Sequence, residues 1–140
     1  MQKSILVTGG TKGIGRAVVE RFAREGFDIF TCARNEHDVT ALRTHLEDTY
    51  PGIQVLAMVA DLSRRDDVSR FAKAVKVLGI PDVLINNTGV FLPGSVHNEP
   101  EGNFEFMIQT NLFSAYHLTR EFVHEMIGRR SGHILSLIHI

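Results

Sequence analysis

The chain has 140 residues, of which 44% are hydrophobic and 22% charged, and a net charge of −1 when its histidines are neutral. This length suits one domain with its own hydrophobic core, and the near-neutral charge gives no bias towards nucleic acid or an acidic membrane surface. The single cysteine, Cys32, excludes an internal disulfide framework and favours a reducing compartment.

Strand-like and helix-like segments alternate along the chain. Apolar runs predict strands and amphipathic spacing predicts helices in the order strand 4–8, helix 14–25, strand 27–33, helix 36–49, strand 53–60, helix 66–78, strand 82–86, helix 103–129 and a strand from 132 onwards. The strands are apolar on both faces, which is typical of a parallel sheet covered by helices on both sides. The predicted fold class is therefore α/β, a Rossmann-like doubly wound parallel sheet, incomplete at about five strands and four helices.

Two local features refine this pattern. Ser63 is expected to cap the third helix. In the last helix, apolar residues at helical spacing predict a buried stripe made of Phe104, Ile108, Leu112, Ala115, Phe122 and Met126.

The most informative motif joins the first strand to the first helix. Gly9 permits a tight turn, Gly13 lets phosphates approach the backbone, and Gly15 lets the helix pack closely on the sheet. Backbone N–H groups and a helix N-terminus would then face an anion such as a dinucleotide pyrophosphate. The predicted cofactor-binding residues of this turn are Gly9, Thr11, Lys12, Gly13, Ile14 and Gly15. An ordinary strand-to-helix turn is the alternative interpretation.

The end of the second strand indicates which dinucleotide is bound. An acidic residue there would bind the ribose 2′-OH of NAD, but Asp28 lies at the wrong end of this strand, and the ligand end carries Arg34 and Asn35. Lys12 could reach the same place, and arginine suits a bidentate phosphate contact. These residues predict the 2′-phosphate of NADP(H), with NAD disfavoured; solvated basic side chains are the alternative.

The third and fourth strands end in further candidate residues. Asp61, followed by Leu62, could accept a hydrogen bond from the adenine amino group, or could simply cap the next helix. Asn87, Thr88 and Gly89 could bring the backbone close to the cofactor, or could form an ordinary turn rich in asparagine. All five are predicted to bind the cofactor.

Together these segments resemble the classical short-chain dehydrogenase/reductase family. The segment 8–15 matches that family's Thr-Gly-x-x-x-Gly-x-Gly turn, and Asp61 is similar to its adenine-binding aspartate. Residues 86–89 are similar to its Asn-Asn-Ala-Gly segment, with Thr88 where alanine is usual. Asn111 falls at the position of the family's active-site asparagine. The resemblance covers about residues 1–134, and more loosely suggests the bacterial 3-oxoacyl reductases.

This resemblance implies an enzyme that transfers a hydride reversibly between the nicotinamide of NADP(H) and a carbonyl or alcohol carbon of a small molecule. Members of the family use a tyrosine as general acid/base, a lysine that lowers its pKa, and a serine that orients the carbonyl. Asn111 would support the proton relay through water. The resemblance also implies a homo-oligomer, a dimer or tetramer, for the full-length protein.

The family pattern breaks towards the C-terminus. The closest string to Tyr-x-x-x-Lys runs from Tyr116 to Arg120; it precedes the fifth strand, and we interpret both as ordinary helix residues. His139 stands where the catalytic serine is expected. We therefore expect residues 1–134 to be the cofactor-binding part of a truncated gene and residues 135–140 to be a non-native tail, similar to a translated sequencing adapter. Such a fragment should be poorly soluble and inactive.

Other function classes are less well supported. A non-catalytic NADP-binding module or redox sensor is the alternative, while the compact Asn-Asn-Thr-Gly segment disfavours a nucleotide-sugar epimerase. His117 and His124 could share a helix face, but no other ligand completes a set, so no metal site is expected. We find neither a signal peptide nor a bilayer-spanning apolar run, so no membrane partner is expected and the expected location is the cytoplasm. The near-neutral net charge gives no reason to expect a nucleic-acid partner.

Overall fold

A computed structural model describes residues 2–138 of the chain. The elements in chain order are β1 (Ser4–Thr8), α1 (Gly13–Arg24), β2 (Asp28–Ala33), α2 (Glu36–Thr49), β3 (Val55–Val59), α3 (Arg65–Leu78), β4 (Val83–Asn86), α4 (Asn103–Ile108), a π-helical segment (Gln109–Phe113), α5 (Ser114–Gly128) and β5 (His133–Ser136). The expected α/β class and the alternation of strands and helices are confirmed.

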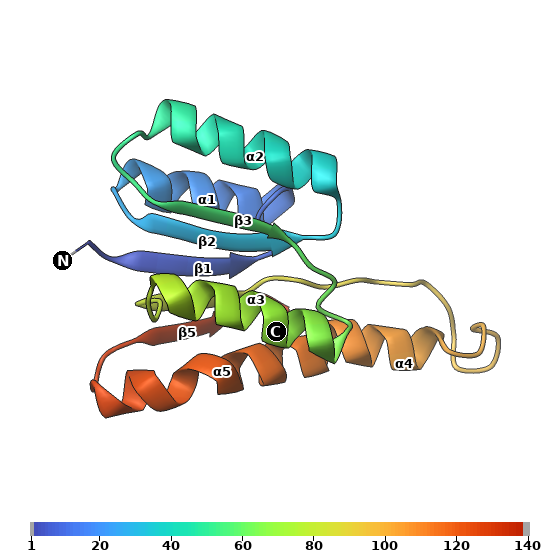
Figure 1. Cartoon of the computed structure of the whole chain (residues 1–140). Helices are drawn as coiled ribbons and strands as arrows, with labels where there is room; N and C mark the ends of the chain where they lie inside the picture. The colour runs from blue at the N-terminus through green and yellow to red at the C-terminus, as the bar shows by residue number, and fades with distance from the viewer. Residues whose placement is uncertain (1, 139–140) are drawn as a thin grey trace.

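The five strands form one parallel sheet with the order β3-β2-β1-β4-β5 (Figure 1). The chain runs outward from β1 to β3 and then crosses back to β4, on the other side of β1. Because β1 and β4 send their connections to opposite faces, their carboxyl ends border a crevice at this switch point. The doubly wound architecture therefore places the ends of β1 and β4 beside a site that can hold a ligand.

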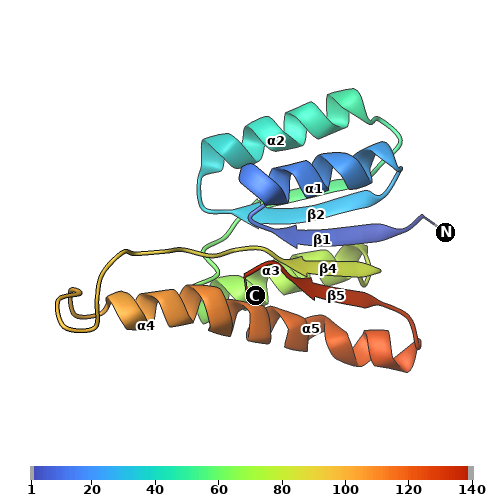
Figure 2. The ribbon, with the colours of Figure 1, turned by 180° about the vertical axis from the view of Figure 1, so that it is seen from behind.

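Helices cover both faces of the sheet, α1 and α2 on one and α3 with α5 on the other (Figures 1 and 2). Neighbouring residues of β1 serve the two layers in alternation. Ile5 and Val7 pack with α1 and α2, whereas Leu6 packs with α3 and α5, and all three are fully buried. A strand that is apolar at every position is thus explained by burial on both sides.

The helix expected over 103–129 is continuous, but its middle turns are π-helical. The buried residues are Thr110 in the π-helical segment and then Ser114, Leu118, Phe122 and Met126 in α5. The expected apolar stripe is therefore wrong in its first half, because Phe104 is 57% and Leu112 45% exposed. A π-helical turn holds an extra residue, so it shifts the phase of the face that meets the sheet.

One helix start differs from the sequence-based expectation, whereas the fifth strand lies where it is expected. Arg64, not Ser63, is the N-cap residue of α3; the hydroxyl of Ser63 donates instead to the Asp61 carboxylate over 2.7 Å. Leu135 continues β5 in register with Ile85. All four β5 residues are exposed, so this strand is an uncovered edge of the sheet. His139, the position expected for the family's serine, lies outside the described residues.

Candidate functional site

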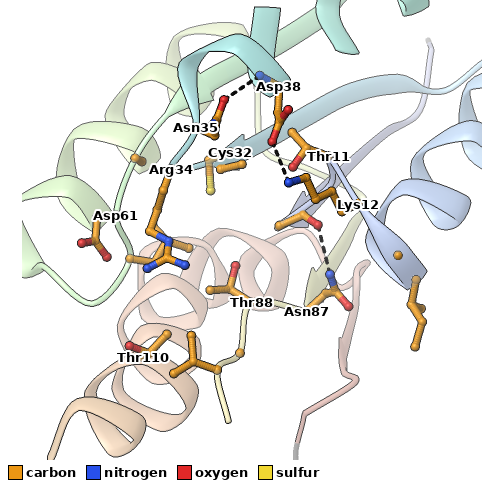
Figure 3. Close-up of a pocket in the computed structure, with 18 residues that line it drawn as sticks. Thr11, Lys12, Cys32, Arg34, Asn35, Asp38, Asp61, Asn87, Thr88 and Thr110 are labelled. Carbon is orange, nitrogen blue, oxygen red and sulfur yellow. Dashed lines mark hydrogen bonds and ion pairs between the residues drawn. The ribbon is translucent and has the colours of Figure 1, made fainter. Parts of the chain in front are cut away.

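A cleft of about 730 Å³ opens at the carboxyl ends of the strands (Figure 3). It is lined by Gly9, Thr11, Lys12, Gly13, Ile14, Cys32, Ala33, Arg34, Asn35, Asp38, Ala60, Asp61, Leu62, Asn87, Thr88, Gly89, Val90 and Thr110. Among the described residues, Gly15 and Asn111 are the sequence-based site candidates that do not line it. The cleft therefore collects the candidates from the ends of β1, β2, β3 and β4 at one place.

The glycine turn is shaped by backbone conformations that side chains disfavour. Gly9 has φ +67° and Gly13 has φ +56°, both in the left-handed region. Gly15 lies beneath the turn, where a Cβ atom would come closer than 3.0 Å to the carbonyl oxygen of Gly9 and to the amide of Asn87. Because α1 begins at Gly13, its N-terminal N–H groups lie at the cleft, an arrangement that favours an anion.

Asn87 and Thr8 fasten the end of β4 to the glycine turn. Thr8 Oγ1 accepts hydrogen bonds from the backbone N–H groups of Asn87 and Thr88, each over 2.9 Å. The side-chain amide of Asn87 donates to the carbonyl oxygens of Thr8 (3.0 Å) and Gly9 (3.2 Å). This asparagine therefore fixes the geometry of the turn with its amide N–H₂ group.

The charges at the end of β2 are arranged less simply than the sequence suggests. Lys12 Nζ lies 3.0 Å from a carboxylate oxygen of Asp38, in the first turn of α2 (Figure 3). The hydrogen bond from Lys12 is the main reason that the pKa of Asp38 is lowered. In contrast, the Arg34 guanidinium makes no hydrogen bond or ion pair with any other described residue. Arg34 is thus available for a phosphate, whereas Lys12 is already paired with the carboxylate of Asp38.

Asn35 and Asp61 both have structural roles at the cleft. Asn35 Oδ1 accepts from the backbone N–H of Asp38 over 3.0 Å and so caps α2. Asp61 Oδ1 accepts from the N–H (3.0 Å) and the hydroxyl (2.7 Å) of Ser63. The other Asp61 oxygen has no partner within the part of the chain that the structure describes. The aspartate can therefore complete the turn before α3 and still accept from a ligand.

Cys32 and Asp38 line the cleft although the sequence did not single them out as ligands. Burial raises the pKa of the Cys32 thiol to about 12, so it remains an uncharged wall of the cleft and not a nucleophile. One signal in the sequence could have identified Asp38 as a cleft residue. It is an acidic residue in the first turn of α2, and the glycine turn carries a basic residue that could pair with it. Val90 and Thr110 carried no comparable signal.

Comparison with known proteins agrees with this geometry. The family model described as short chain dehydrogenase matches residues 3–138. The chain belongs to the short chain dehydrogenase family. A tropinone reductase homolog of Arabidopsis thaliana is 42% identical over 120 residues, which are 84% of this chain and 44% of that protein. An NADPH-dependent pterin aldehyde reductase of the same plant is 28% identical over 137 residues, 96% of this chain and 55% of that protein.

Solved structures of a reductase and of an oxidoreductase share this fold. L-sorbose reductase from Gluconobacter frateurii, complexed with NADPH and L-sorbose, superposes with a TM-score of 0.90 at 27% identity, over 96% of this chain and 51% of the reductase. A metagenomic short-chain oxidoreductase in complex with NADP gives a TM-score of 0.87 at 29% identity, over 96% of this chain and 60% of that protein. This short chain dehydrogenase chain thus spans about half the length of the proteins that it matches.

Asn111, the predicted catalytic residue, lies beside the cleft, whereas Tyr116 and Arg120 are ordinary residues of α5. The side chain of Asn111 accepts from the N–H of Val90 (2.7 Å) and donates to its carbonyl oxygen (2.8 Å), so it clamps the segment after β4 to the π-helical turn. Arg120 donates to the hydroxyl of Tyr116 over 3.1 Å on the exposed face of α5, which raises the pKa of Arg120. That face borders a separate apolar groove along β5.

Residues 2–138 contain no group of three or more His, Cys, Asp or Glu side chains that could hold a metal ion. None of the helices described is both long enough and apolar enough to cross a membrane.

Proposed function

We propose that this chain is the cofactor-binding part of an NADP(H)-dependent oxidoreductase that interconverts a carbonyl and an alcohol on a small molecule. The observation that carries the proposal is the guanidinium of Arg34, which is unpaired among the described residues and stands where an NAD-binding protein has an acid. The NADPH and NADP complexes of similarly folded proteins support the choice of cofactor.

The residues present fit a dinucleotide phosphate. The left-handed glycine turn and the N-terminus of α1 would hold the pyrophosphate through backbone N–H groups. Arg34 would hold the 2′-phosphate through bidentate hydrogen bonds, with Lys12 beside it. The free oxygen of Asp61 would accept from the adenine amino group. When bound, the nicotinamide supplies or accepts the hydride.

Turnover needs groups that this chain does not provide. Its two tyrosines, Tyr50 and Tyr116, are followed four residues later by Gln54 and Arg120, so the 140 residues contain no Tyr-x-x-x-Lys pair. Assayed alone, the chain should bind NADPH and show no reduction of a ketone. For the complete protein we propose a cytoplasmic homo-oligomer, and Asn111 as the residue that supports the proton relay.

The experiment that tests the proposal compares wild type with Arg34→Ala by calorimetric titration with NADPH and NADH. Wild type should prefer NADPH, and the variant should lose roughly tenfold or more in NADPH affinity while NADH affinity stays nearly constant, because only NADPH carries the 2′-phosphate. Equal losses for both cofactors would defeat the assignment of Arg34. Binding of neither cofactor by wild type would defeat the proposed function.

A non-catalytic NADP-binding module or redox sensor is the second candidate, because the residues that line the cleft account for binding of the cofactor alone. The two candidates differ in the complete gene product. An oxidoreductase would consume NADPH when offered a panel of ketones, whereas a sensor would bind the cofactor with no turnover of any of them.

A further inference from the structure

Thr110 is a buried side chain with an unsatisfied hydroxyl at the wall of the cleft. The residue is only 5% exposed, and its Oγ1 has no hydrogen-bond partner among residues 2–138. Thr110 nevertheless lines the cleft together with Val90 and Asp61. Buried hydroxyl groups are nearly always hydrogen-bonded in folded proteins, and leaving one unpaired costs free energy. An unpaired hydroxyl at a ligand cleft therefore points to a partner supplied by the ligand.

The neighbouring side chains are already engaged elsewhere. Asn111 exchanges two hydrogen bonds with the backbone of Val90, so its amide is not available to Thr110. The hydroxyl of Ser114 donates to the backbone carbonyl oxygen of Thr110 and leaves the threonine side chain unpaired. Thr110 also lies in the π-helical segment, and such segments occur frequently at functional sites.

The position of Thr110 selects the part of the ligand that it would meet. Figure 3 shows Thr110 across the cleft from Lys12 and the glycine turn, on the side of Asp61 and Thr88. Phosphates would lie at the turn and at Arg34, because those positions offer N–H donors and a cation. The adenosine ribose carries the 2′-phosphate and would therefore lie next to Arg34. The adenine ring is then the part left for Thr110, and it carries both ring acceptors and an amino donor.

We propose that the hydroxyl of Thr110 hydrogen-bonds the adenine ring of the bound dinucleotide and so contributes to its recognition. The inference rests on the proposed function, because it assumes that this cleft binds an adenine dinucleotide. A hydroxyl can donate or accept, so either a ring nitrogen or the amino group of adenine satisfies it.

The test uses Thr110→Val, which removes the hydroxyl and keeps the shape of the side chain, and Thr110→Ser, which keeps the hydroxyl. Adenosine 2′,5′-bisphosphate carries the adenine and both phosphates, whereas inorganic pyrophosphate carries no adenine. Calorimetric titration should show the valine variant binding the bisphosphate about three- to thirtyfold more weakly than wild type, with the serine variant close to wild type. Pyrophosphate affinity should be the same in all three proteins. The ligand-free valine variant should melt at the wild-type temperature or above it, because it no longer buries an unpaired hydroxyl.

The other outcomes overturn the inference in distinguishable ways. If the valine variant binds the bisphosphate as wild type does, the hydroxyl does not contact adenine. If the variant loses affinity for the bisphosphate and pyrophosphate alike, the hydroxyl acts only through the fold. If wild type binds neither probe, the proposed function itself fails. Should the valine variant not fold, Thr110→Ala compared with Thr110→Ser makes the same test.

Discussion

Replacing Gly15 by alanine tests how the glycine turn closes against the end of β4. An added Cβ would lie closer than 3.0 Å to the carbonyl oxygen of Gly9 and to the side-chain nitrogen of Asn87. The first of these is backbone, and the second is held by its hydrogen bonds to Thr8 and Gly9, so neither can move away freely. The substitution must therefore shift α1 away from the sheet or break the bonds of Asn87.

The expected loss follows from these contacts. Overpacking costs about 1–3 kcal/mol, and weakening both hydrogen bonds of Asn87 adds roughly 1–2 kcal/mol. The higher helix propensity of alanine returns about 1 kcal/mol, so the free energy of unfolding should fall by about 1–4 kcal/mol. For a chain of this size this lowers the melting temperature by roughly 3–15 °C.

Urea titrations followed by circular dichroism measure the change, and Gly128→Ala is the matched control. Gly128 is also helical, at the end of α5, but its added Cβ meets no atom within 4 Å. The control should be neutral or up to about 1 kcal/mol more stable than wild type. If Gly15→Ala loses no more stability than Gly128→Ala, the close approach of turn, helix and β4 does not constrain this fold.

Three further predictions concern charge. Asp38→Asn removes a carboxylate that would repel a 2′-phosphate, so calorimetry should show tighter NADPH binding and little change in NADH binding. The control is Glu36→Gln, which lies in the same helical turn and has no ion pair among the described residues. An equal gain in NADPH affinity for the control would contradict this explanation. Because folding lowers the pKa of Asp38, its pair with Lys12 stabilises the fold fully at neutral pH, and this stability is lost as the pH falls below about 4. The melting temperatures of wild type and Asp38→Asn should therefore converge on acidification. Leu135→Lys places a charge on the exposed β5 edge and should raise the monodisperse fraction in light scattering; unchanged aggregation would show that this edge is not the cause.

The sheet could be predicted because its signals are local and repeated. Each strand is a short apolar run bounded by turn residues. Ile5, Leu6 and Val7 are all buried, so a continuous apolar run is enough to predict a strand that is covered on both faces. The long helix shows where this reasoning stops. The spacing of apolar residues predicts a buried Leu112 only if the helix is uniformly α-helical. The π-helical segment instead turns Thr110 inward and leaves Leu112 45% exposed. Composition gives no signal for one extra residue in a turn.

The location of the cleft could also be predicted, since parallel strands bring their carboxyl ends to one edge of the sheet. The hydrogen bonds that each side chain makes at the cleft could not be predicted. Asn87 and Asn111 are predicted to serve the cofactor, and in the folded chain their amides also bind backbone groups of Gly9 and Val90 that shape the cleft. Such hydrogen bonds depend on side-chain directions that are set only when distant segments meet. Whether these asparagines also contact a ligand stays a prediction.

The pairing of charges at the cleft changes the physical basis of the proposed cofactor preference. From the sequence, Lys12 and Arg34 are equivalent cations. In the folded chain Asp38 holds Lys12 at 3.0 Å, so a phosphate arriving at Lys12 must share it with a carboxylate or displace that carboxylate. Arg34 has no such competitor among the described residues, and its planar guanidinium can hold two phosphate oxygens at once. Selectivity for a 2′-phosphate would therefore rest mainly on Arg34, with Asp38 setting how much Lys12 adds.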